Sequence, residues 1–137
     1  MTPKRLIPLA NGLTIDEQFR TEAELPVRRA AIQDAAKHLT EAITKANIKD
    51  KIGYAGIADA TDTLESVHAA IDDIKMPNEQ NFQHIFLYIE IDSAMKMSEL
   101  AELNNAATAT CPDGVESSIF YQTTLPHKGR KTLAITF

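Results

Sequence analysis

The most strand-like run of apolar and polar positions in the chain lies between Phe82 and Asp92. Side chains alternate between the two faces of a β-strand, so one face of this segment is wholly apolar: Ile85, Leu87, Ile89 and Ile91. The other face is mixed: His84, Phe86, Tyr88 and Glu90. A strand with one apolar face and one half-apolar face is typical of a sheet that is covered on both sides. We therefore predict an interior strand on which the rest of the chain packs.

Four helices are predicted, three from the helical spacing of apolar residues and one from a capping-box spacing. The longest pattern runs from Val27 to about Asn47, with apolar positions recurring every 3.6 residues. A second apolar stripe follows Asp62, which has Glu65 three residues later, as expected of an N-cap, and it ends before Pro77. A third helix is predicted after Asp92, with Ser93 or Ser98 as its cap. A fourth is predicted from Ile15 to about Ala23, because Thr14 and Glu17 have the spacing of a capping box.

Further strands are predicted on either side of these helices. Residues 6–9 form a short strand or an extended arm, which Pro8 restricts to a sheet edge. Residues 52–58 form a strand interrupted by two glycines. The last two strand-like runs, 117–124 and 131–137, predict a hairpin closed by residues 125–130.

This order of elements predicts a single globular domain that spans residues 1–137. Strands that alternate with helices favour an α/β fold with a mixed sheet of about four strands, helices packed on it and a C-terminal β-hairpin. The alternative is a ferredoxin-like α+β fold with an antiparallel sheet. That alternative applies if residues 52–58 are not a strand.

Composition narrows the function classes. The chain has 44% hydrophobic and 24% charged residues, as a globular protein has, and its formal charge of −5 disfavours nucleic acid as a partner. No segment approaches the ~20 apolar residues of a membrane span. Cys111 is the one cysteine, so neither an intrachain disulfide nor a CxxC metal site is expected. These features predict an acidic, soluble, cytoplasmic protein.

The mixed strand face carries the sharpest candidate site. His84, Tyr88 and Glu90 are residue types that serve as general acids and bases. Neighbours on this face are about 6.5 to 7 Å apart along the strand, so we expect no direct hydrogen bonds along the row and expect a water, a substrate or another residue to bridge it. The alternative is a covered face with structural polar groups. His68 is predicted to be a buried histidine, or to meet His84 and Glu90 if its helix packs on that face.

A second candidate site is a basic cluster in the loop before the last strand. It consists of His127, Lys128, Arg130 and Lys131, in an otherwise acidic chain. Such a cluster suits an anion, and its alternative is a solvated loop that protects a sheet edge. No HExxH, Walker A, GxGxxG or GxSxG signature is present, so we predict neither a metal nor a cofactor.

Taken together, these patterns favour a non-enzymatic binding or regulatory protein over an enzyme. Its partner would be another protein or its own copy in a homodimer, held by an exposed part of the sheet and the acidic helix faces. The alternative is a small-molecule-binding protein or enzyme whose pocket lies over the strand face of His84, Tyr88 and Glu90.

Overall fold

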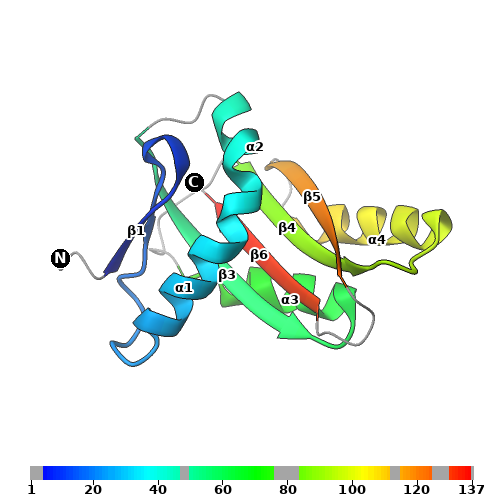
Figure 1. Cartoon of the computed structure of the whole chain (residues 1–137), viewed down its shortest axis with the longest axis horizontal. Coiled ribbons are helices and arrows are strands. Elements are labelled where there is room, and N and C mark those ends of the chain that lie inside the picture. Colours follow the sequence, from blue (N-terminus) through cyan, green and yellow to red (C-terminus); the bar gives the residue numbers. More distant parts are fainter. Residues whose placement is uncertain (1–4, 47–49, 76–83, 112–114, 125–129, 137) are drawn as a thin grey trace.

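The computed structural model describes residues 5–46, 50–75, 84–111, 115–124 and 130–136, which form a mixed sheet with helices on both faces (Figure 1). The strands are β1 (Leu6–Pro8), β2 (Thr14–Asp16), β3 (Ile52–Ala60), β4 (His84–Asp92), β5 (Glu116–Thr124) and β6 (Arg130–Thr136). The α-helices are α1 (Leu25–Ala36), α2 (Thr40–Lys45), α3 (Thr63–Asp73) and α4 (Met97–Thr110). Two 3₁₀ turns accompany them: η2 (Ala10–Gly12) and η3 (Lys37–Leu39).

The predicted α/β class and mixed sheet are confirmed, but the sheet has six strands instead of about four. Its order is β1-β2-β3-β6-β4-β5. Strand β6 is antiparallel to both β3 and β4, whereas β2 runs parallel to β3 and β4 runs parallel to β5. The parallel pairs make the ferredoxin-like alternative wrong.

The predicted C-terminal hairpin is also wrong, because β4 lies between β5 and β6. Residues 132–136 of β6 are all buried, so this strand needs a neighbour on each side and a cover on each face. Strand β5 lies at the margin of the sheet, and its residues Glu116, Gln122 and Thr123 are exposed. The turn residues between the two strands predicted a hairpin, but the burial of β6 requires that it lie inside the sheet, between β3 and β4.

The two additional strands come from the N-terminal part of the chain. The predicted short strand at residues 6–9 is confirmed as β1 at a sheet edge. The predicted helix from Ile15 to about Ala23 is wrong, because Ile15 is fully buried in β2 and pairs with Gly53 of β3. Between β1 and β2 the chain reverses at Asn11, whose φ of 59° is left-handed, a conformation that asparagine tolerates better than most residues.

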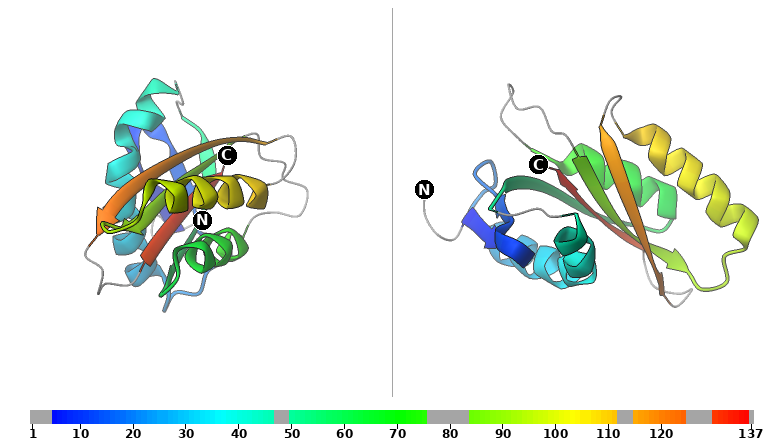
Figure 2. Two further views of the ribbon diagram at one scale, coloured as in Figure 1. Left: turned by 90° about the vertical axis from the view of Figure 1, so that its right-hand side faces the viewer. Right: turned by 90° about the horizontal axis from the view of Figure 1, so that it is seen from above.

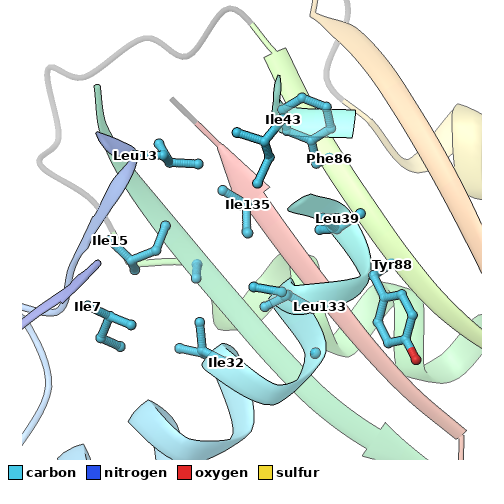
Figure 3. Close-up of a cluster of buried hydrophobic side chains, with 13 residues drawn as sticks. Ile7, Leu13, Ile15, Ile32, Leu39, Ile43, Phe86, Tyr88, Leu133 and Ile135 are labelled. Carbon is cyan, nitrogen blue, oxygen red and sulfur yellow. The ribbon is translucent and has the colours of Figure 1, made fainter. Parts of the chain in front are cut away.

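One face of the sheet is covered by the long helical segment predicted for residues 27–47. The segment is confirmed in outline as α1 and α2, with η3 between them and Pro26 in the first turn. Its predicted end at Asn47 lies outside the described residues. Figure 3 shows how its apolar side chains meet those of the sheet, and the cluster includes Ile32, Leu39, Ile43, Phe86, Tyr88, Leu133 and Ile135. Each such side chain contributes about 1.5 to 3 kcal/mol when it is fully buried.

The opposite face is covered by α3 and α4, as the turned views show (Figure 2). The wholly apolar face of β4 packs there, and the interior position predicted for this strand is confirmed over residues 84–92. Asp62 is confirmed as the cap of α3, because its carboxylate accepts the N–H of Glu65 at 3.1 Å. Neither Ser93 nor Ser98 caps α4, which begins after Lys96.

Helix α3 lies unusually close to β3, and Gly56 is the reason. A Cβ at position 56 would stand 1.9 Å from the carbonyl oxygen of Ala70 and 2.9 Å from Ile74. Gly56, one of the two glycines that interrupt the predicted strand at residues 52–58, is therefore a packing feature of a confirmed strand.

Candidate functional site: a buried ion-pair network before α1

Four charged side chains meet between the start of α1 and the end of α3. Glu17 accepts from Nε of Arg20 at 3.2 Å and from Nε of Arg28 at 3.1 Å. Asp73, the last residue of α3, accepts from Nη1 of Arg20 at 3.1 Å and from Nη1 of Arg28 at 2.8 Å. Both arginines also donate to the carbonyl oxygen of Ala55 in β3. The four charges cancel and form a closed network.

Three of the four side chains are largely shielded from water. The side chains of Glu17 and Arg20 are 2% and 4% exposed and that of Arg28 is 11% exposed, whereas Asp73 is 28% exposed. Burial alone would lower the pKa of Arg28, but its hydrogen bond to Asp73 and the charge of Glu17 raise the pKa above its ordinary value. Arg28 therefore stays charged. The backbone N–H of Ile57 also donates to Asp73, at 3.0 Å, so the network joins the sheet at two points of β3.

The network fixes a segment that has no regular secondary structure of its own, residues 17–24. Its backbone is held further by Arg5, whose N–H groups donate to the carbonyl oxygens of Glu17 and Arg20. Two large apolar side chains are exposed here: Phe19 within the segment, at 46% exposure, and Val27 in the first turn of α1, at 74%. Each precedes one of the two buried arginines. Ion pairs and backbone hydrogen bonds therefore restrain this segment and the start of α1, and both present an apolar side chain to solvent.

The predicted row of His84, Tyr88 and Glu90 is only partly brought together. His84 is at one end of β4, where Nε2 lies 2.9 Å from Oγ of Ser118 and Nδ1 lies 3.4 Å from Oε2 of Glu116. The ring of Phe86 stacks on His84, with centroids 4.6 Å apart, and separates it from Tyr88. His84 therefore takes no part in a group with the other two.

Tyr88 and Glu90 do interact directly, which corrects the expectation that neighbours on this face are too far apart. The Tyr88 O–H donates to Oε2 of Glu90 at 3.4 Å, because the two long side chains lean toward each other. Oε1 of Glu90 accepts the backbone N–H of Lys131 at 3.1 Å. Tyr88 is 3% exposed, and its ring stacks on His38 of η3 with centroids 5.0 Å apart. Burial, and then the charge of Glu90, raise the pKa of Tyr88 to about 12.

His68 is exposed on α3, so its predicted burial is wrong. Its predicted meeting with His84 and Glu90 is wrong too, because α3 packs on the opposite, apolar face of β4. Among the residues that the structure describes, no group of three or more histidine, cysteine or acidic side chains is arranged to hold a metal. The same residues form no helix that is long and apolar enough to cross a membrane.

The predicted basic cluster falls mostly outside the described residues. His127 and Lys128 lie there, and of Arg130 only the strand backbone is described. Lys131 is half-buried in β6 with its backbone N–H on Glu90. The anion-binding role of these residues stays a prediction.

Sequence reasoning missed the ion-pair network because no local signal marks it. Glu17 and Arg20 were assigned to a helix, where their spacing resembles an ordinary surface pair. Asp73, which pairs with both arginines, is 53 residues from Arg20 and 45 residues from Arg28. Only the fold brings these positions together.

Comparisons with known proteins extend the picture of the fold. No protein-family model and no curated protein sequence matches the chain. Solved structures do: an FtsZ dimer from M. jannaschii has a TM-score of 0.60 and 12% identity over 87% of this chain and 40% of that one. A point mutant of FtsZ from M. jannaschii has a TM-score of 0.55 and 13% identity over 85% of this chain and 41% of that one. The chain thus spans about two fifths of the solved chains that it resembles, and at these identities what it shares with them is the fold.

Proposed function

We propose that this chain is a non-catalytic protein-association module and that the surface of residues 17–28 holds a partner protein. The observation that carries the proposal is the combination of the ion-pair network with exposed Phe19 and Val27, which precede its two arginines. A segment that is already rigid loses little conformational entropy when it binds. Exposed aromatic side chains are frequent anchors of protein interfaces.

Two further observations support this function over catalysis at the mixed strand face. The polar groups there are engaged within the fold: Glu90 by Tyr88 and Lys131, and His84 by Ser118. Tyr88 is buried beneath the helical segment that covers the sheet. A protein of similar fold is described as a dimer, which agrees with an association role.

Site-specific photocrosslinking in cells that produce the protein tests the proposal. A benzophenone amino acid replaces Phe19 or Val27, and a matched control carries it at Glu41, which is exposed on α2. We expect discrete protein adducts from positions 19 and 27 and none from position 41, with the partner identified by mass spectrometry. The same adducts from all three positions, or no adduct from 19 and 27, would refute the proposal.

A second variant separates a specific surface from a merely sticky one. The probe at position 27 is combined with Phe19→Ser, which removes the aromatic side chain and leaves the buried network intact. We expect the adduct from position 27 to decrease at least severalfold. An undiminished adduct would show that Phe19 is no part of the interface.

A further inference from the structure

The outer margin of the sheet at β5 is open among the residues that the structure describes. Strand β5 has nine residues and pairs with β4 on one side only. Its other side therefore carries a row of backbone N–H and C=O groups that can pair with a further strand. The opposite margin of the sheet differs, because β1 has three residues and ends in Pro8.

Strand β5 also lacks the features with which soluble proteins protect an edge. Such edges usually carry lysines, prolines, bulges or charges that point inward. After Glu116, β5 has neither a charged residue nor a proline, and its register with β4 is continuous from Glu116 to Thr124. A long, uncharged and regular edge is suited to β-strand addition.

We infer that this edge binds the β5 edge of a second copy of the chain, antiparallel and about a two-fold axis. A two-fold interface needs a surface that complements itself. Full overlap of residues 116–124 with a second copy is reached when Phe120 lies opposite its own counterpart. In that register Ile119 faces Tyr121 and Glu116 faces Thr124, so aromatic and β-branched residues pair and no like charges meet.

Helix α4 adds a second uncharged strip beside the same edge. The Tyr121 O–H donates to Oδ1 of Asn104 at 2.8 Å, which shows that this flank of α4 is turned toward β5. Helical spacing places Met97, Ala101 and Thr108 on the flank of Asn104. Met97 is 80% exposed, and the acidic residues Glu99 and Glu102 project from other sides of the helix. Figure 2 shows β5 and α4 next to each other at this end of the molecule.

The strip is large enough for a dimer. Nine strand residues extend about 30 Å, and a sheet layer with a helix layer is about 20 Å thick. The two copies together would bury on the order of 1,200 Å², which is the lower end of the range for stable interfaces. This surface is distinct from residues 17–28, so the outcome at either surface leaves the other proposal standing.

Light scattering and sedimentation velocity of the purified chain test the inference. We expect the mass of two chains for the wild type and of one chain for the double variant Gln122→Lys and Thr123→Lys, which places lysines on exposed positions of the edge. The control Asp72→Lys makes the same total change in charge on the exposed side of α3 and should remain a dimer. A monomeric wild type at millimolar concentration, a dimeric double variant or a monomeric control would each overturn the inference.

Hydrogen exchange of the wild type tests the same contact without any substitution. The N–H groups on the outer side of β5 should exchange at least tenfold more slowly at high than at low protein concentration, because a second strand then binds them. Exchange in β5 that does not depend on concentration would overturn the inference. In that case, the strand that pairs with the β5 edge would have to come from a different protein.

Discussion

Arg20 and Arg28 divide the carboxylate of Asp73 between them: Nη1 of Arg20 lies 3.1 Å from Oδ1, and Nη1 of Arg28 lies 2.8 Å from Oδ2. Arg20 also donates to the backbone carbonyl of Asp73 at the end of α3. Cations are favourable at this end of a helix because its dipole is negative there. The segment before α1 and the end of α3 are therefore coupled and cannot shift independently.

Removing one charge of this network should destabilise the fold strongly. Glu17→Gln keeps the shape of the side chain but leaves two buried arginines with one carboxylate, which should cost about 3 to 5 kcal/mol of unfolding free energy. Urea unfolding followed by circular dichroism measures it. Asp34→Asn is the control, because its ion pair with Lys37 is exposed to water and the unfolding midpoint should not move. Equal, small effects of both substitutions would contradict a structural role for the network.

The sequence allowed good predictions wherever the determining interactions are local. The alternation of residues 84–92 predicted an interior strand, and the spacing of Asp62 and Glu65 predicted the cap of α3. The same local reasoning failed at Thr14 and Glu17, because their spacing fits a capping box while the chain there pairs with β3. Strand β2 is three residues long, too short for alternation to be recognised.

The candidate site was less predictable than the fold. Its hydrogen bonds join residues that lie 11 to 53 positions apart when the close pair Glu17 and Arg20 is left aside. The order of the strands in the sheet could not be predicted from local sequence patterns either. Nothing local to β6 shows that it inserts between β3 and β4, although its continuous burial explains the position once it is seen.

The cap of α3 offers a prediction of moderate size. Asp62→Ala removes the acceptor for the N–H of Glu65 and should lower the unfolding free energy by about 1 kcal/mol. Asp62→Asn keeps an acceptor at the same place and should restore most of the loss. Thermal or urea unfolding of the three proteins provides the comparison. An alanine variant as stable as the wild type would contradict the capping role of this side chain.

Gly56 should not tolerate even a methyl group. In Gly56→Ala the new Cβ would meet the Ala70 carbonyl oxygen, so α3 must move away from β3 at a cost of about 1 to 3 kcal/mol or more. Ala58→Gly is a suitable comparison, because it changes the backbone freedom of the same strand without adding an atom. The unfolding free energies of the two variants and the wild type are compared by urea unfolding. An alanine variant at position 56 as stable as the wild type would show that α3 is not packed so closely.

Tyr88 should make the fold sensitive to alkaline pH. Its pKa is raised to about 12 in the folded chain, against about 10 when unfolded, so the unfolded state releases the proton first. The stabilising contribution is therefore complete below about pH 10 and is lost as the pH rises toward 12.

The side chain of Tyr88→Phe cannot ionise, so the unfolding free energy of this variant should fall less steeply between about pH 10 and 12. Burial also raises the pKa of Tyr121, so a smaller slope should persist in the variant. Urea unfolding at several pH values measures both slopes. Glu90→Gln removes the second cause of the raised pKa and should give an intermediate slope, whereas identical slopes for all three proteins would contradict the burial of the Tyr88 hydroxyl beside Glu90.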